Sequence, residues 1–417
     1  MSKAALKNVN PANSASGPEI LIPKSSHSDW LSQDELKELT VEKIVARVTA
    51  LQPMISAKAR QAEIEREADH EVWSALRKTG IFYLMVPRSR GGLEAGLQAF
   101  IDVILPIGKM DASLAWTAAF SVMHQWQIAQ FPAQCQKEVW DALPYVTSAG
   151  SAFPQGKAVK VDGGFILSAH HKYCSGIMHS EWANSVAAFE TPEGEKKLML
   201  AMLPIDAVQV LDTWHVDGMA GTGSHDIVYK DVFVPDHMIV MMDDIRQGNL
   251  KHKVPAYRIP FSSFLGLVVS VPTLAAALGE IERFRSRLLA PGPDGSVPDK
   301  PLARAGLARV SVEARAAELL IRDSARDAEE LAAKGLLTGA ERARIRAQYS
   351  VGVKMCLGIL RSITDLSSSS VHMLSHPTQR ALRDVTMISS HATLETSSSL
   401  DDYGRNMLNM PSLWFLA

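Results

Sequence analysis

Cysteine is scarce in this chain: Cys135, Cys174 and Cys356 are widely spaced along 417 residues and odd in number. This usage excludes a disulfide framework and a cysteine zinc site, and it is typical of a reducing compartment, so we expect a cytoplasmic protein. His372 and His376 have a metal-like spacing of four. Because Pro377 follows directly and no third ligand is near, we expect no metal site.

Charge of one sign and long apolar runs are also lacking. The formal net charge is -2, which provides no electrostatic basis for binding nucleic acid. The run over residues 264–277 contains a glycine, a serine and a proline and is shorter than the roughly 20 residues that cross a bilayer, so we expect no membrane span. Residues 1–28 show no signal-peptide pattern and, being rich in Ser, Pro, Asn and Ala, predict a flexible leader.

The chain does contain a large apolar share, 47%, which is enough to bury cores for two or three domains. Its hydrophobic periodicity changes from helical to strand-like and back, which predicts an α+β protein. We expect an N-terminal helical domain over residues 29–143, a central β-barrel or sandwich domain over 144–245, and a C-terminal four-helix-bundle domain over 246–417.

Individual elements follow from the same periodicity. Helical patterns run from Asp34 to Gly80 and from Leu97 to Leu143, with breaks at prolines and glycines. The predicted strands are Phe165–Ala169, Ala183–Phe189, Leu198–Leu203 and Ile227–Val234, and the predicted C-terminal helices are Phe261–Leu289, Leu302–Lys334, Thr338–Leu366 and Pro377–His391.

A glycine-containing tract, Trp214–Asp226, is the most distinctive segment. Gly221, Gly223 and Ser224 resemble a phosphate-binding loop, but such a loop opens a helix and carries a lysine. Here a strand follows, rich in β-branched and aromatic residues, so a nucleoside triphosphate site is excluded. On composition alone, a tight turn between two strands explains the glycines equally well.

Several motifs together carry a resemblance. They are the Gly80–Gly92 segment with its Val-Pro and Gly-Gly, the Tyr173-Cys174-Ser175-Gly176 turn, the Trp214–Ser224 tract and the terminal Arg383-Asp384. In this order they resemble the acyl-CoA dehydrogenase fold over nearly the whole chain. Within it, the chain is more similar to the two-component (group D) flavin monooxygenases, such as the oxygenases that act on p-hydroxyphenylacetate, seco-steroid phenols and dibenzothiophene.

The chemistry distinguishes two activities that this fold supports. A dehydrogenase must remove a proton from the carbon α to a thioester and needs a carboxylate base at the flavin. Neither Glu395 nor Glu280 stands at the position where the resemblance implies one, and His391 occupies one such position. Because an imidazole can accept a phenol or indole proton near neutral pH, we expect an oxygenase. An acyl-CoA dehydrogenase and a non-catalytic flavin-fold protein are the rival hypotheses.

The resemblance implies catalytic roles for His391, Ser175 and His124. His391 and His124 would orient the substrate, with Ser151 as a further substrate contact. The hydroxyl and backbone amide of Ser175 would face nitrogen 5 of the flavin. The structural alternatives are a helix-end histidine, a core histidine and ordinary loop or turn serines.

The resemblance also implies a set of cofactor contacts. Ser369 would reach a flavin phosphate, unless it belongs to a solvated turn. Arg383 would form an ion pair with Asp384 that positions the final segment. Relatives commonly carry Arg where this chain has Ala220, which removes a charged contact from the loop. The complete predicted cofactor-binding set is Tyr173, Cys174, Ser175, Trp214, Gly221, Thr222, Ser224, Ser369 and Arg383.

The resemblance implies a cofactor and partners as well. Reduced FMN or FAD would come from a separate NAD(P)H-dependent flavin reductase, since no Gly-x-Gly-x-x-Gly fingerprint opens a βαβ unit here. Oxygen would add to the flavin as a hydroperoxide and pass to an aromatic or heteroaromatic substrate. Aromatic hydroxylation is the first expectation, and oxidation at nitrogen or sulfur is the alternative. A homotetramer is implied by the family.

Overall fold

The computed structural model describes residues 18–22, 30–291 and 299–414. Its N-terminal part is helical, but the two long helical regions that we predicted are divided into seven helices. Capping side chains divide them: Ser32, Thr40, Asp69 and Asp111 each accept a hydrogen bond from a backbone N–H in the first turn of a helix. These helices are α1 Gln33–Lys37, α2 Val41–Ala50, α3 Gln52–Glu65, α4 His70–Thr79, α5 Leu97–Gly108, α6 Ala112–Ile128 and α7 Ala133–Trp140.

The middle of the chain forms one eight-stranded sheet. Its strand order is β1-β6-β7-β3-β2-β4-β5-β8, and every neighbouring pair is antiparallel except β2 with β4. Register shifts in the β2–β4 and β3–β7 pairings mark irregularities of the kind that bend strands. The strands are β1 Glu19–Ile20, β2 Ser148–Val161, β3 Gly164–His171, β4 Trp182–Glu190, β5 Lys196–Pro204, β6 Gln209–Leu211, β7 Asp226–Pro235 and β8 Ile239–Met241.

The central domain agrees with the predicted fold class, while the expected leader needs correction. The strands follow one hydrogen-bonded order with β1 and β8 at its ends, and β5 also contacts β7, which is not its neighbour in that order, so the sheet folds over on itself as a barrel or sandwich does. Strand β1 falls within residues 1–28, which we predicted to be a flexible leader. Glu19 and Ile20 pair with β6 because that edge strand offers free backbone groups. Residues 1–17 and 23–29 lie outside the described part of the chain.

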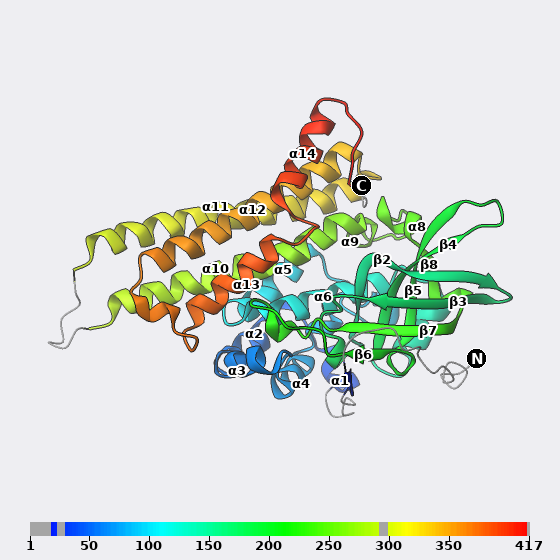
Figure 1. Cartoon of the computed structure of the whole chain (residues 1–417), viewed down its shortest axis with the longest axis horizontal. Coiled ribbons are helices and arrows are strands. Elements are labelled where there is room, and N and C mark those ends of the chain that lie inside the picture. Colours follow the sequence, from blue (N-terminus) through cyan, green and yellow to red (C-terminus); the bar gives the residue numbers. More distant parts are fainter. Residues whose placement is uncertain (1–17, 23–29, 292–298, 415–417) are drawn as a thin grey trace.

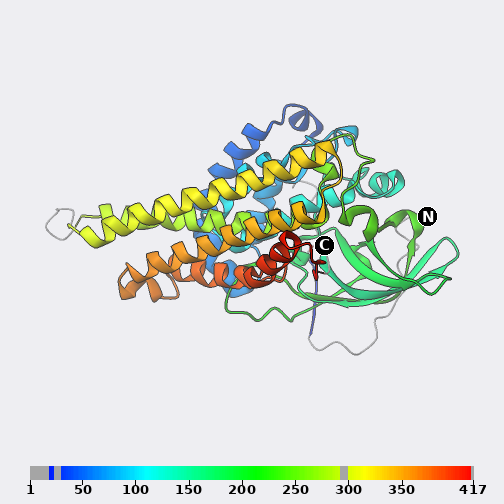
Figure 2. The ribbon, with the colours of Figure 1, turned by 90° about the horizontal axis from the view of Figure 1, so that it is seen from above.

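After the sheet the chain returns to helices. In Figures 1 and 2, α10, α11, α12 and α13 run side by side as a long bundle, and the sheet lies at one end of the molecule. Helix α14 was not predicted. The helices are α8 Met242–Arg246, α9 Pro255–Arg258, α10 Phe261–Leu289, α11 Pro301–Lys334, α12 Gly339–Asp365, α13 Pro377–Ser389 and α14 Thr396–Met407.

Helix α10 is the core of the bundle. By length and composition alone it could cross a membrane, which our expectation from residues 264–277 had missed because the helix continues on both sides of that run. In the fold, 94% of its most apolar 18-residue window is buried. The helix packs against α5, α6, α11 and α12, so protein rather than lipid covers its apolar surface.

Helix α6 connects the parts of the fold. Nearly all of its side chains are buried, and it packs against α5, α10, α13, the start of β2 and the turn at Ala220–Thr222. One surface of α6 therefore meets both the sheet and the end of α13. A cavity opens at this junction.

Candidate active site

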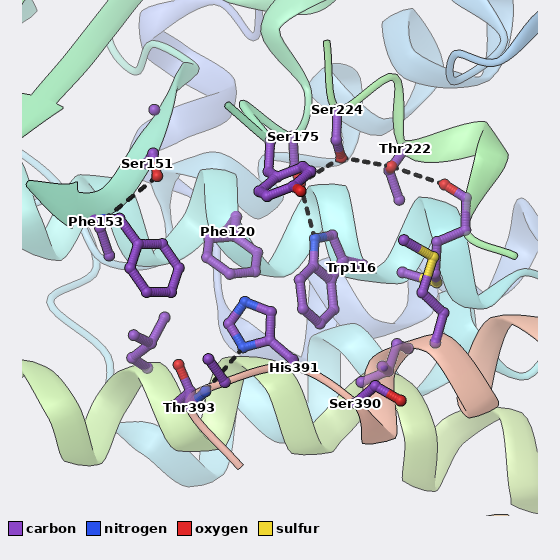
Figure 3. Close-up of a pocket in the computed structure, with 18 of the residues that line it drawn as sticks. Trp116, Phe120, Ser151, Phe153, Ser175, Thr222, Ser224, Ser390, His391 and Thr393 are labelled. Atoms are coloured by element: carbon purple, nitrogen blue, oxygen red, sulfur yellow. Dashed lines mark hydrogen bonds between the residues drawn. The ribbon is translucent and has the colours of Figure 1, made fainter. Parts of the chain in front are cut away.

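The cavity lies between α6, the sheet loops and the end of α13, and has a volume of about 450 Å³ (Figure 3). This is within the usual range of small-molecule sites, roughly 300–1,000 Å³. Most of its walls are aromatic or aliphatic, with a few hydroxyls and two imidazoles. The lining residues are Trp116, Phe120, His124, Gly150, Ser151, Ala152, Phe153, Tyr173, Ser175, Trp214, Val216, Met219, Thr222, Ser224, Leu265, Met387, Ile388, Ser390, His391, Ala392 and Thr393.

Most of the predicted site residues meet in this cavity although they come from distant parts of the chain. All three predicted catalytic residues line it. The predicted residues that line the cavity are His124, Ser151, Tyr173, Ser175, Trp214, Thr222, Ser224 and His391.

Four predicted cofactor contacts lie elsewhere. Cys174 is fully buried, and its thiol faces the carbonyl of His171 at 3.8 Å. Burial raises the pKa of the Cys174 thiol well above its usual value, which suits a packed side chain. Gly221 packs against α3 and α6, and Ser369 is exposed beyond the far end of α12. The fourth, Arg383, lies on α13.

Arg383 does not pair with Asp384, which corrects our predicted ion pair. Successive residues on a helix point in different directions, so the two side chains separate. The Arg383 guanidinium donates to Glu63 and to the carbonyl of Asp217. The Asp384 carboxylate is buried and accepts a hydrogen bond from the backbone N–H of Met219 at 2.6 Å. Both side chains therefore hold the tract Trp214–Ser224 against α13.

A row of hydroxyl groups crosses one wall of the cavity (Figure 3). The indole N–H of Trp116 donates to Ser175 Oγ at 3.0 Å, and Ser175 Oγ lies 2.7 Å from Ser224 Oγ. Ser224 Oγ is in turn 2.6 Å from Thr222 Oγ1, which donates to the carbonyl of Met219 at 2.8 Å. The backbone N–H of Ser175 donates to the carbonyl of Tyr173 at 3.0 Å, so this amide is used within the turn.

Tyr173 and Trp214 form the aromatic edge of the same wall. Their rings meet at 70° with centroids 6.0 Å apart, an edge-to-face contact. Tyr173 has a positive φ of 66° and is 59% exposed, so it is not a core-filling residue. A strained backbone angle in a non-glycine residue is a frequent feature of binding sites.

His124 reaches the cavity from α6. Its Nδ1 lies 2.5 Å from the carbonyl oxygen of Ser148. Because a carbonyl only accepts, Nδ1 carries the proton in the neutral ring and Nε2 has a free lone pair. Burial lowers the pKa of His124 to about 4, so the ring is neutral at pH 7.

His391 lies just beyond the end of α13, and its hydrogen-bonding polarity is opposite to that of His124. Its ring does not bind the terminal carbonyls of the helix. Instead, Nδ1 accepts the backbone N–H of Thr393 at 3.3 Å, which places the proton on Nε2. Burial lowers the pKa of His391 to about 4, and the ring packs edge-on to Trp116 with centroids 5.4 Å apart. One neutral imidazole thus offers a lone pair and the other an N–H.

No carboxylate lines this cavity among the residues that the structure describes. Glu395 caps α14 by accepting the N–H groups of Ser397 and Ser398, and Glu280 is buried against Arg283 and Thr378. Within the same described ranges, no group of three metal-binding side chains occurs. An apolar, aromatic-walled cavity with hydroxyls along one edge fits the flat ring of a flavin and its polar nitrogen edge.

Some lining residues carried no signal in the sequence. Trp116 and Phe120 belong to a mostly apolar helix that is buried on nearly all sides, so nothing distinguishes a cavity wall from a core position. Phe153 lies in the first half of β2, a strand that we did not predict. Met219 was visible only as part of the glycine tract, although its backbone has a positive φ of 59° and its carbonyl receives three donors.

Comparisons with known families agree with this geometry. Residues 41–148 match the model of the acyl-CoA dehydrogenase N-terminal domain, and residues 273–396 match that of the C-terminal domain. A pigment production hydroxylase of Rhodococcus sp. is 30% identical over 389 residues, which cover 90% of this chain and 98% of that protein. The oxygenase component of an FADH2-dependent resorcinol hydroxylase of Rhizobium sp. is 28% identical, with 88% and 94% covered.

Solved structures show the same fold. The crystal structure of 3-HSA hydroxylase from Rhodococcus sp. superposes with a TM-score of 0.83 at 24% identity and covers 90% of this chain and 99% of that one. A structure of XiaF from Streptomyces sp. with FADH2 and glycerol has the same TM-score, 0.83, and covers 92% and 98%. By its sequence, its fold and its carboxylate-free cavity, the chain belongs to the flavin-dependent monooxygenases of the acyl-CoA dehydrogenase fold, as an oxygenase component that uses reduced flavin from a separate reductase.

Proposed function

We propose that this oxygenase hydroxylates a small aromatic substrate of the phenol or indole type. One observation carries the proposal: two neutral imidazoles of opposite hydrogen-bonding polarity line a cavity of about 450 Å³ that has aromatic walls and no carboxylate. The relatives support the same class, because one is named for resorcinol and another, from Pseudomonas putida, is an indole-3-acetate monooxygenase.

We assign the flavin ring to the side of the cavity that carries the hydroxyl row. There Ser175 and Ser224 would border its polar edge, and Trp214 and Tyr173 would contact its ring. Bound reduced flavin supplies the chemistry by activating O2 and delivering one oxygen atom to the substrate. The protein's own contribution is to orient both molecules and to exclude water with apolar walls.

We assign the substrate to the region near His124 and His391. The free lone pair on Nε2 of His124 would accept the proton of a phenol O–H or indole N–H, which enriches the ring that receives oxygen. The N–H at Nε2 of His391 would donate to the oxygen that is transferred or to the substrate. Phe120 and Phe153 would hold the aromatic ring by edge and face contacts.

We extend the proposal to the reductase, the cellular compartment and the oligomeric state. The reductase would be NAD(P)H-dependent, the oxygenase would act in the cytoplasm, and the chain would assemble as a homotetramer. Exposed apolar side chains on α11 and α14, among them Val312, Leu319 and Met407, support assembly because their burial between subunits removes them from water.

A direct test mixes the protein anaerobically with reduced FMN or FAD, adds O2 together with simple phenols and indoles, and identifies the products by mass spectrometry. We expect a product heavier by one oxygen atom, labelled when 18O2 is supplied. If instead an acyl-CoA thioester bleaches bound oxidised flavin without oxygen, and no phenol or indole is oxygenated, the proposal is wrong.

A further inference from the structure

The hydroxyl row has a direction, which follows from counting protons. The carbonyl of Met219 can only accept, and it lies 2.8 Å from Thr222 Oγ1, so the single hydroxyl proton of Thr222 must lie between them. Without that proton, two lone-pair-bearing oxygens would face each other. Thr222 therefore has only lone pairs to offer Ser224.

The same counting continues along the row. Ser224 must donate its proton to Thr222, over 2.6 Å, because Thr222 has none left to give. Ser175 must then donate to Ser224, over 2.7 Å. At the other end, the indole N–H of Trp116 is donor-only and occupies one lone pair of Ser175. The row is a one-way chain of hydrogen bonds from Trp116 to the carbonyl of Met219.

Ser175 consequently has no proton to offer the cavity that it lines. Its hydroxyl proton is used by Ser224, and its backbone N–H donates to the carbonyl of Tyr173 at 3.0 Å. What remains is one lone pair on Oγ. Our sequence-based expectation is that the hydroxyl and amide of Ser175 face nitrogen 5 of the flavin, and these contacts leave the hydroxyl only as an acceptor there.

The end of the chain is held in place from outside the cavity. Met219 is anchored through its N–H to the buried carboxylate of Asp384, and the indole N–H of Trp214 also donates to its carbonyl at 3.0 Å. A Cβ at Gly218 would lie 2.5 Å from the carbonyl oxygen of Arg383, so the tract sits directly on the backbone of α13. The acceptor that sets the direction of the chain therefore cannot easily turn away.

We propose that this one-way chain makes Thr222 and Ser224 positioning residues that select the redox state of the flavin. The inference rests on the proposed function, in which Ser175 borders the nitrogen edge of the ring. Nitrogen 5 of oxidised flavin is a hydrogen-bond acceptor, whereas that of reduced flavin carries an N–H. A lone pair from Ser175 is complementary to reduced flavin and faces a like lone pair in oxidised flavin, so the site favours the form that a reductase delivers.

The test compares dissociation constants of oxidised and reduced flavin, measured anaerobically by ultrafiltration. For the wild type, we expect the dissociation constant of oxidised flavin to exceed that of reduced flavin, so that their ratio is greater than one. In Thr222→Val, Ser224 loses its acceptor and turns its proton to Ser175, which then donates into the cavity. In Ser224→Ala, Ser175 itself loses its acceptor. Both ratios should fall about fivefold, the equivalent of one neutral hydrogen bond, chiefly because oxidised flavin binds more tightly.

Damage to the fold would weaken the binding of both forms of flavin, whereas the inference expects oxidised flavin to bind more tightly. Thr222→Ser keeps a hydroxyl and should keep the wild-type ratio. Thr117→Val is the matched control, since Thr117 is a buried threonine of α6 whose hydroxyl donates only to its own helix. It should also leave the ratio unchanged.

Distinct outcomes separate the two proposals. The inference is overturned if wild type binds both flavins equally, or if Thr222→Val and Ser224→Ala keep the wild-type ratio while reduced flavin still binds; the proposed function survives either result. If phenols and indoles are not oxygenated although reduced flavin binds preferentially, the proposed substrate class fails and the inference stands. If the wild type binds no flavin, both fail.

Discussion

The carboxylate of Asp384 on α13 accepts the backbone N–H of Met219 at 2.6 Å, and so joins the C-terminal bundle to the wall of the cavity. Burial is the main cause that raises the pKa of Asp384 to about 7, and the neighbouring Asp111 adds to the shift. Arg380 and Arg383 oppose it. A group with a raised folded-state pKa retains its proton in the fold and loses it on unfolding. Its stabilising contribution is complete at low pH and disappears as pH rises towards 7.

Asp384→Asn removes this titration while it keeps an oxygen that can accept from Met219. We expect the free energy of unfolding of the variant, relative to wild type, to rise by up to ~1.4 kcal/mol per pH unit between pH 5 and 7 and to level off above pH 8. Urea unfolding at each pH measures the difference. Asp401→Asn, at an exposed position on α14, controls for loss of a charge. A difference that does not change with pH would contradict the titration of Asp384.

The two imidazoles predict an unusual pH profile. Because burial lowers the pKa of both His124 and His391 to about 4, both rings stay neutral well below the ordinary histidine pKa of about 6.5. Product formed per reduced flavin should be constant from pH 8 to about 5.5 and should fall only as pH approaches 4. An inflection near pH 6.5 that disappears in His124→Gln or His391→Gln would show that the rings titrate normally.

Removal of the His391 side chain should separate flavin binding from oxygen transfer. In His391→Ala we expect reduced flavin to bind within about threefold of wild type, because the hydroxyl row is intact. Product per reduced flavin should fall at least about tenfold, the range of a lost acid–base group, with hydrogen peroxide formed instead. Both products are quantified after one turnover. His372→Ala, an exposed histidine away from the cavity, should leave the yield unchanged, and an unchanged yield in His391→Ala would refute the role of His391.

The contact of Gly218 with α13 predicts a strong effect of one methyl group. In Gly218→Ala the new Cβ would lie 2.5 Å from the backbone oxygen of Arg383, and backbone atoms cannot move aside as a side chain can. We expect a loss of about 1–3 kcal/mol in stability and weaker binding of reduced flavin, because Trp214 and Thr222 shift with the tract. Thermal unfolding and flavin titration measure the two effects.

Gly358→Ala on α12 is the matched control for that substitution. Nothing lies within 4 Å of a Cβ at Gly358, so alanine should stabilise the helix by about 0.5–1 kcal/mol and leave flavin binding unchanged. If Gly218→Ala behaves like Gly358→Ala, the tract is not held against α13 in solution.

The sequence was sufficient where an element is a long or alternating apolar stretch bounded by turn residues. Helix α10 has the predicted bounds, Phe261–Leu289, and the four predicted strands all occur within β3, β4, β5 and β7. Strand β2 was missed because its residues, such as Ser148 and Gly156, are small or polar and a register shift interrupts the alternation. Helix α14 was missed because its serines and glycine have low helix propensity, and a glutamate cap starts it.

For the cavity, the chain alone identified the residues whose chemistry is visible in a motif, such as His391, Ser175 and Thr222. Only the tertiary structure decided which of their atoms are available. The partners of three side chains decide this. The backbone N–H of Thr393 places the proton of His391 on Nε2, the carbonyl of Ser148 leaves a lone pair on Nε2 of His124, and Ser224 accepts the hydroxyl proton of Ser175. Residue type determines which bonds a side chain can form, whereas its neighbours in space determine which of those bonds are already made.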